Sequence, residues 1–242
     1  MCVDIYRVNV APLYARDMDS LARLTREISK CTLCARLVRC REAAAADPPK
    51  RFVGSDYWAR PVPGFGDPRA RLLGVGLAPA AHGGNRTGRV FTGDRSGDWL
   101  YAALHQAGFA NQPESVSVAD GLRLKDAYVA CIVRCAPPDN KPSPVERDRC
   151  IGYFERELTL LPRVRAILAL GAFAWDGVLL AATALGHVPP KPRPKFAHGA
   201  QAAIGPWRLF GSYHVSQQNT FTGRLTEPML DAVFAAARSA LE

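Results

Sequence analysis

The stretch that decides the fold begins at Arg71–Leu77, which reads RLLGVGL. A short apolar run of this kind, bounded by polar residues, is typical of a buried strand. Similar runs follow at Ala127–Val133 (AYVACIV), Val164–Leu170 (VRAILAL) and Trp207–Tyr213 (WRLFGSY). Because strands that are apolar on both faces belong to sheets covered on both sides, these four runs predict a parallel sheet.

Segments with helical signals separate the predicted strands, as the crossovers of a parallel sheet require. The clearest signal lies at Ser143, where a serine N-cap, Pro144 at the first helical position and Glu146 form a capping box. Further helices are expected at residues 19–31, 97–107, 172–185 and 227–241. The predicted fold class is α/β: a three-layer αβα sandwich with a central four-stranded parallel sheet.

The remaining segments are expected to be irregular. Residues 1–17 lack periodicity and predict a loose N-terminal arm, while residues 43–70 and 186–206 are rich in proline and glycine and predict long loops. We therefore expect residues 1–242 to form one domain. No apolar run reaches the ~20 residues of a membrane span, and the first residues lack a signal peptide, so we expect a cytoplasmic monomer with no membrane association.

The charge of the chain is strongly basic. Lysine and arginine number 31 against 22 acidic residues, which gives a net charge of +9. Such a balance indicates a polyanionic partner, most often nucleic acid. A solvated basic surface without a partner is the alternative.

Four of the seven cysteines form a candidate metal site. Cys31 and Cys34 make a C-x-x-C pair at a predicted helix end, and Cys135 and Cys150 flank a proline-rich loop and the first turns of the capped helix. Four thiolates without a nearby histidine fit either a zinc site with four cysteine ligands or a [4Fe–4S] cluster. The wide spacing of the second pair favours iron–sulfur, since a zinc ribbon normally has a second close C-x-x-C.

Two alternatives to this ligand set remain open. Cys40 lies six residues after Cys34 and is the main rival ligand. Cys135 and Cys150 could instead be ordinary buried thiols, which are common in protein cores. Cys131 falls within a predicted strand and is interpreted as core or pocket lining.

The loop after the first predicted strand has ligand-binding features. It reads GLAPAAHGGNRTGRVFTGD over residues 76–94, where glycines allow close backbone approach and Arg86 and Arg89 could meet phosphates. Phe91 is suited to stacking on a planar base. The loop matches neither a Walker nor a Rossmann pattern. A structural glycine turn with a core phenylalanine is the alternative.

The loop after the fourth predicted strand reads HVSQQNTFTGRLT over residues 214–226. Because parallel sheets place ligands beyond the carboxyl ends of their strands, His214 is expected at the edge of the site, where it could donate to a leaving group. Phe221 could wedge into a base stack. Further residues of this loop offer donors for backbone phosphates: Ser216, Gln217, Gln218, Asn219 and Thr220. A satisfied surface histidine is the alternative for His214.

These two loops, together with RCAPPDNKPSPVERDRC at residues 134–150, resemble motifs of the type B, or family 5, uracil-DNA glycosylases. The resemblance runs from about Cys31 to Thr226. It implies the αβα sandwich of that superfamily, a [4Fe–4S] cluster on Cys31, Cys34, Cys135 and Cys150, and hydrolytic removal of uracil, hypoxanthine, xanthine and ethenocytosine from DNA.

The resemblance also implies roles for particular residues. Phe91 would stack on a flipped base, and His214 would stabilise the negative charge on the departing base. The predicted base-binding set comprises Gly76, Leu77, Ala78, Ala80, Ala81, His82, Phe91 and Asn219. The predicted DNA-binding set comprises Arg86, Arg89, Ser216, Gln217, Gln218, Thr220, Phe221 and Arg224.

The residue that activates water is not evident. Many relatives in the superfamily carry a carboxylate or amide where this chain has Leu77 and Ala78, neither of which can polarise water. Either the sugar cation forms first and any nearby water suffices, or another group orients the water. Asn85 and Asn140 are the predicted substitutes, and Asp94 is a rival that is better placed as the N-cap of the next helix. The alternative to a DNA glycosylase is a non-enzymatic iron–sulfur protein that binds nucleic acid or transfers electrons.

Overall fold

The computed structural model describes residues 19–242, so the predicted N-terminal arm lies outside the described residues. Its centre is a six-stranded sheet in the order β1-β3-β2-β4-β6-β5. The strands are β1 (Phe65–Gly66), β2 (Leu72–Gly76), β3 (Ala127–Cys131), β4 (Ala166–Leu170), β5 (Gln201–Ile204) and β6 (Trp207–Ser212). The four predicted strands are the parallel centre of this sheet, as expected.

Both edge strands were missed by the sequence analysis, which predicted loops at 43–70 and 186–206. β1 has only two residues and pairs antiparallel with β3. β5 pairs antiparallel with β6 through a hairpin closed by the pair Ile204 and Trp207. Short edge strands bury too little apolar surface to produce a clear hydrophobic pattern, which explains the error.

Five helices lie where helical signals predicted them: α1 (Leu21–Ser29), α4 (Arg95–Gln106), α5 (Pro144–Leu160), α6 (Ala172–Ala184) and α8 (Glu227–Ser239). The capping box of α5 is present, since the Ser143 hydroxyl accepts from the Glu146 amide and the Glu146 carboxylate accepts from the Ser143 amide.

The helix α2 (Ala35–Ala46) corrects the prediction that residue 43 begins a loop. Its last turn is an alanine run, and alanine has the highest helix propensity of all residues. Four shorter helical segments were also not predicted: η1 (Lys50–Phe52), α3 (Gly84–Thr87), η2 (Pro138–Asn140) and α7 (Gln217–Phe221).

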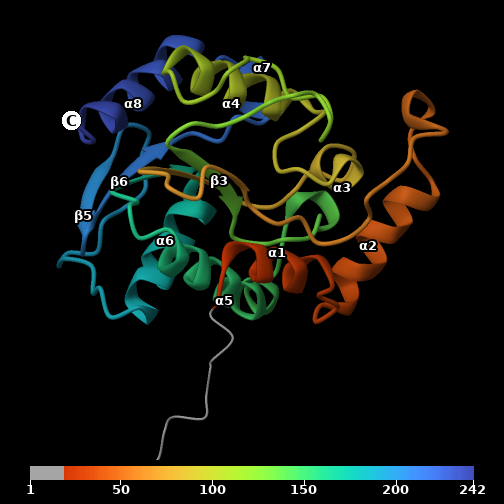
Figure 1. The fold of residues 1–242 in the computed structure, drawn as a ribbon, viewed down its shortest axis with the longest axis horizontal. Coiled ribbons are helices and arrows are strands. Elements are labelled where there is room, and N and C mark those ends of the chain that lie inside the picture. Colours follow the sequence, from red (N-terminus) through yellow and green to blue (C-terminus); the bar gives the residue numbers. More distant parts are fainter. Residues whose placement is uncertain (1–18) are drawn as a thin grey trace, which may run out of the picture.

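The helices form two layers, one on each face of the sheet (Figure 1). The helices α5 and α6 pack together on one face, with α1 against α5, while α4 and α8 cover the other face. Alternate residues of β2 point to opposite layers, with Leu73 and Val75 in one core cluster and Leu72 in the other. The predicted three-layer sandwich is therefore confirmed.

The parallel strands set the position of the functional loops. The segments that follow β2, β3, β4 and β6 all begin at the carboxyl edge of the sheet, and α3, η2 and α7 lie within three of them. Among residues 19–242, no helix has the length and apolar character needed to cross a membrane.

Candidate active site and metal centre

The ring of Phe91 lies over the carboxyl end of β2. A Cβ added to Gly76 would come 2.5 Å from Phe91 Cζ and 3.3 Å from Cys131 Sγ, so only glycine fits beneath the ring. Phe91 has a φ of 50°, in the left-handed region that bulky residues rarely adopt. Backbone conformations of this kind are concentrated at functional sites, and the ring itself is only 6% exposed and packs in one of the two core clusters.

His214 approaches Phe91 from the end of β6. The two ring centroids are 6.2 Å apart, with an interplanar angle of 35°. At the end of β4, a Cβ on Gly171 would lie 3.4 Å from the Cβ of His214. Three strand ends therefore supply one site, as the parallel topology predicts.

The hydrogen-bonding state of His214 suits it to act on a ligand. Burial lowers the pKa of its imidazole to about 4, so the ring is neutral at pH 7 and carries one N–H donor. Within residues 19–242, no group hydrogen-bonds to either ring nitrogen. Asn219 Nδ2 donates to the main-chain carbonyl of His214 over 2.8 Å, so this predicted base-binding residue positions the histidine loop.

The predicted water-orienting residues lie in different environments. Asn85 is fully buried, and its Nδ2 donates to the carbonyls of Arg41 and Ala81. Its Oδ1 is buried and has no hydrogen-bond partner among residues 19–242. Asn140, in contrast, is exposed at the end of η2 with a φ of 55°.

Asp94 is the N-cap of α4, as predicted. Its Oδ1 accepts from the amides of Ser96 and Gly97 over 2.9 and 3.1 Å. Its Oδ2 packs against Gly83, where a Cβ would collide with it. Burial raises the pKa of this carboxyl above its ordinary value, and the two cap bonds partly oppose that rise.

The other predicted residues of the first loop are held largely through the backbone. The amides of Ile132 and Val133 donate to the carbonyls of Gly76 and Leu77 over 3.0 Å each, which extends the pairing of β2 with β3. Ala78, Ala80 and Ala81 lie in the turn that follows, where Ala78 and Ala81 are partly exposed.

Arg89 requires a correction, because it is not a surface residue. The side chain is only 4% exposed, and it forms an ion pair with Asp120 over 2.6 Å. It also donates to the hydroxyls of Thr92 and Ser115. These contacts hold the loop around Phe91 and leave no guanidinium surface for a phosphate.

The loop after β6 presents its side chains to solvent. The short helix α7 carries exposed Gln217 and Gln218, and Phe221 at its end is 69% exposed. Ser216 and Thr220 lie on the same turn and are partly exposed. The guanidinium of Arg224 lies 4.6 Å from the ring centre of Tyr213. This loop therefore offers donors and one exposed aromatic ring beside His214.

The four predicted cysteine ligands line one cavity. Burial raises the pKa values of Cys34, Cys135 and Cys150, and the neighbouring thiol of Cys31 raises each of them further. Cys40 does not line this cavity, and the charged groups that act on its thiol are Arg36, Asp139 and Glu146. The structure thus separates Cys40 from the other four thiols.

Comparisons with known proteins decide the family. The family model of the uracil DNA glycosylase superfamily matches residues 63–238. A type-5 uracil-DNA glycosylase of Mycobacterium tuberculosis is 52% identical over 221 residues, which cover 90% of this chain and 81% of the relative. The chain belongs to the type-5 uracil-DNA glycosylases.

Two further members of this family match over most of their length. The type-5 enzyme of Thermus thermophilus is 51% identical over 212 residues, 87% of this chain and 94% of the relative. That of Pyrobaculum aerophilum is 44% identical over 209 residues, 86% of this chain and 87% of the relative. The resemblance seen in the loop motifs is therefore confirmed, and the family supports an enzyme over the non-enzymatic alternative.

The lining of the cysteine cavity suits the [4Fe–4S] cluster that the family motif implies. Among residues 19–242, no three His, Cys, Asp or Glu side chains converge as they would around a single metal ion. A four-iron cluster needs four thiolates spaced around a larger group. Three arginines line the same cavity, Arg41, Arg134 and Arg149, and their charge suits an anionic centre.

Two of these arginines have buried nitrogens without a partner in the described chain. Arg41 Nη1 donates to Cys135 Sγ over 3.2 Å, while its Nε is unpaired. Arg134 forms an ion pair with buried Glu157, while its Nε and Nη1 are unpaired. Buried unpaired donors are costly, so these groups fit a site that receives an anionic partner. The residues present therefore fit a [4Fe–4S] cluster.

Sequence reasoning missed these two arginines. Arg41 lies in a helix that was not predicted, and Arg134 follows a strand and was read only as part of a motif. Arginine is normally a surface residue, so nothing in the pattern signals that both are withdrawn from water. Their nearness in sequence to Cys40 and Cys135 is the one available hint.

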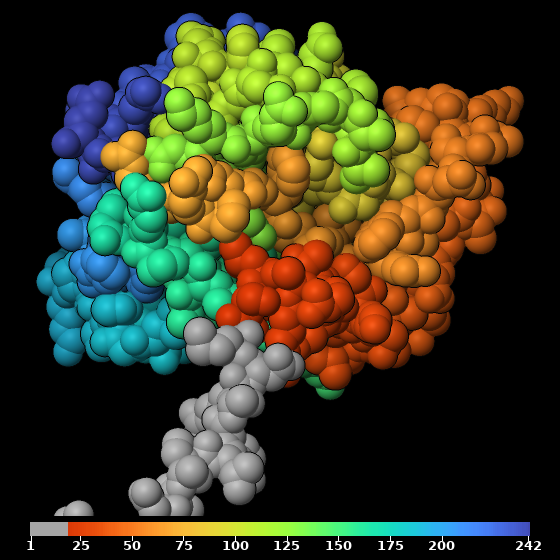
Figure 2. Space-filling model, viewed as in Figure 1, coloured from red at the N-terminus to blue at the C-terminus, as the bar shows by residue number. Residues whose placement is uncertain are grey.

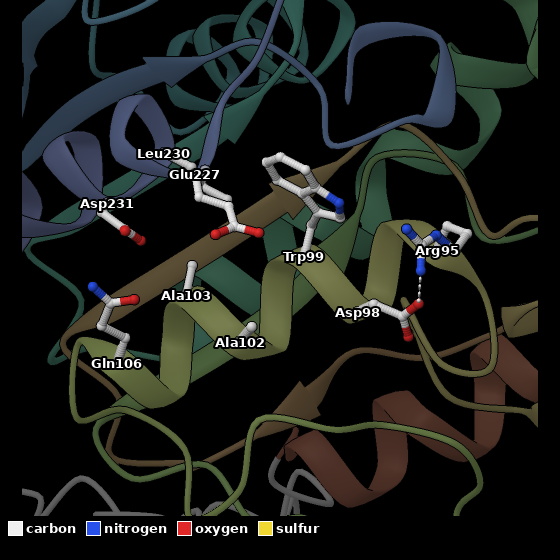
Figure 3. A pocket seen from close by; sticks show the side chains of 9 residues that line it. All are labelled: Arg95, Asp98, Trp99, Ala102, Ala103, Gln106, Glu227, Leu230 and Asp231. Atoms are coloured by element: carbon white, nitrogen blue, oxygen red, sulfur yellow. Dashed lines mark hydrogen bonds and ion pairs between the residues drawn. The ribbon is translucent and has the colours of Figure 1, made fainter. Parts of the chain in front are cut away.

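A separate groove lies between α4 and α8 (Figure 3). It has a volume of about 240 Å³ and is lined by residues that include Trp99, Gln106, Glu227 and Asp231. An exposed ion pair between Arg95 and Asp98 marks one end. None of the predicted site residues lines this groove, so it is distinct from the site at Phe91 and His214.

Proposed function

We propose that the chain hydrolyses the glycosidic bond of uracil in DNA at the site between Phe91 and His214. The observation that carries the proposal is the closeness of two rings at the carboxyl edge of the sheet: Phe91, whose backbone has a positive φ, and the neutral imidazole of His214, which has no hydrogen-bond partner among residues 19–242. The two residues belong to the loops that match the type-5 glycosylases.

The reaction requires a base taken out of the stack, because the glycosidic bond is inaccessible within a duplex. Phe91 stacks on the flipped base, and backbone groups of Gly76–Ala81 bind its polar edge. As the bond from C1′ to nitrogen breaks, the electron pair goes to the base. The His214 N–H donates to the base oxygen that gains negative charge, a preorganised contact typically worth ~3 kcal/mol.

Water completes the hydrolysis. Its oxygen bonds to C1′ of the sugar cation, and its proton leaves to solvent or to a nearby acceptor, so that the products are a free base and an abasic site. The proposed groups that orient this water are Asn140 and Asn85, whose Oδ1 has no partner in the described part of the chain. Asp94 is the alternative, with a carboxyl of raised pKa that could accept the proton.

The range of bases is proposed to extend beyond uracil. Ala78 and Ala80 follow β2 and carry only a methyl group each, which leaves space for a purine. Hypoxanthine, xanthine and ethenocytosine are the proposed further substrates.

The four cysteines are proposed to hold a [4Fe–4S] cluster that acts as a structural cross-link. It would join the segment between α1 and α2 to the segment after β3 and to α5. Arg41, Arg134 and Arg149 would offset its negative charge. Phe221 is the proposed wedge. The proposed phosphate contacts of the active site are Arg86 of the first loop together with Ser216, Gln217, Gln218, Thr220 and Arg224.

The test is product analysis with duplexes that contain uracil, hypoxanthine or xanthine opposite their usual partners. The expected result is free base and an abasic site, with no strand break before alkali is added. The His214→Ala variant should lose ~10²–10³-fold in turnover while it keeps DNA binding. Intact duplexes with every base would refute the proposal.

A further inference from the structure

The segment that follows α2 projects from the body of the protein beside α3 (Figures 1 and 2). This segment includes Phe52, whose ring is contacted by two guanidinium groups. The Cζ of Arg51 is 4.7 Å from the ring centroid, and the Cζ of Arg86 is 4.2 Å from it. We refer to Arg51, Phe52 and Arg86 as the arginine–phenylalanine cluster.

This cluster is anchored to the loop of the active site. The rings of Phe52 and His82 stack, with centroids 6.1 Å apart and an interplanar angle of 29°. The hydroxyl of Tyr57 is hydrogen-bonded to His82 Nδ1 over 2.9 Å. Arg86 donates from Nε to the His82 carbonyl and from Nη2 to the Gly93 carbonyl. The cluster is therefore connected directly to the loop that carries Phe91.

The two positive charges lack a counter-ion in the described chain. No carboxylate of residues 19–242 lies within ion-pair distance of Arg51 or Arg86, although Asp94 is within electrostatic range of Arg86. Arg51 is exposed, so its guanidinium is available to a partner. Two like charges gathered on one ring repel each other, and a bound anion would remove that cost.

We propose that the arginine–phenylalanine cluster binds a backbone phosphate of duplex DNA next to the flipped base. The proposal rests on the proposed function, because it takes the partner to be the DNA substrate. Arginine binds phosphate through its planar fork of donors, which exposed Arg51 can present. Arg86 donates from Nε and Nη2 to main-chain carbonyls, so it would contribute its charge and the donors of Nη1. Lys50 and Arg60 are also exposed on the projecting segment and extend the basic surface.

An alternative is that the two arginines only cover Phe52 with their apolar stems. In that case the guanidinium charges would not affect DNA affinity beyond what any surface charge contributes. Arg208 provides the matched comparison, since it is an exposed arginine near the start of β6, at the opposite end of the sheet from the active site.

The experiment measures the affinity of the holoprotein for an undamaged duplex as a function of salt between about 0.05 and 0.2 M. Loss of one phosphate contact should reduce the slope of log affinity against log salt by about one in Arg51→Ala. Arg51→Lys should restore most of the slope, and Arg208→Ala should match the wild type. The same duplex with a G·U pair reports uracil release separately.

The results separate this proposal from the proposed function. If wild-type protein binds the undamaged duplex and Arg51→Ala has the slope of Arg208→Ala, the cluster does not bind phosphate. The proposal also fails if the slope of log affinity against log salt follows the melting temperatures of the variants and not the charge at position 51. A wild-type protein that binds duplex but releases no uracil would refute the proposed activity and leave the phosphate site standing.

Discussion

The side-chain amide of Asn85 donates a hydrogen bond to the main-chain carbonyl of Arg41 over 3.1 Å. The guanidinium of that same arginine donates to Sγ of Cys135 over 3.2 Å. A two-residue path therefore joins the loop of Phe91 to a proposed cluster ligand. Because Asn85 also binds the carbonyl of Ala81, it fixes the start of α3 against α2.

Asn85→Ala is expected to destabilise the protein by about 1–3 kcal/mol, because it removes a fully buried side chain and its hydrogen bonds to the carbonyls of Arg41 and Ala81. Urea unfolding of the holoprotein measures the change. Asn111 provides the control, since it makes hydrogen bonds to Gly121 and Arg123 but is exposed. Equal losses of unfolding free energy in Asn85→Ala and Asn111→Ala would contradict a buried connection between α3 and α2.

The central sheet could be predicted because its strands are buried on both faces and read as unbroken apolar runs. β5 could not, since its exposed and partly buried residues resemble a loop. The convergence of Phe91 and His214 followed from topology, because each lies in a segment that begins where a parallel strand ends. The burial of Arg89 could not be foreseen, since its partner Asp120 lies 31 residues away in a segment without a pattern.

The pKa of His214 predicts an unusual pH profile. Its ordinary value of 6.5 falls to about 4, so the ring is neutral from pH 8 down to about pH 5. The single-turnover rate of uracil release should therefore show no titration near pH 6.5. The free energy of unfolding should fall as the pH drops from about 6.5 to 4. Over this range His214 is protonated in the unfolded chain but remains neutral in the folded protein, so protons favour the unfolded state.

The variant His214→Gln supplies the control for this profile, since glutamine keeps an N–H donor but does not titrate. Its acid-induced loss of stability over the same pH range should be smaller than that of the wild type. A wild-type rate that halves near pH 6.5, with a flat profile in His214→Gln, would show that the imidazole is not held neutral.

Gly76→Ala is expected to displace the Phe91 ring, since the new Cβ would lie 2.5 Å from Cζ. Overpacking of this kind costs about 1–3 kcal/mol, and a misplaced stacking ring should lower the rate of base release by ~10²-fold. Gly152 on α5 is the matched control, because a Cβ there meets nothing within 4 Å. Gly152→Ala should keep full activity, and equal activity in both variants would contradict a stacking role for Phe91.

Cys40 and Cys135 allow the proposed ligand set to be tested directly. Cys135→Ala should abolish iron and sulfide incorporation, because it removes one of four thiols around the cavity and the acceptor of the Arg41 bond. Cys40→Ala should retain the wild-type iron content and visible absorption, since Cys40 does not line the cavity. Both variants and the wild type are compared after anaerobic purification, by metal analysis and absorption spectroscopy. Iron loss in Cys40→Ala would place Cys40 among the ligands, and a zinc-loaded, iron-free wild type would refute the cluster itself.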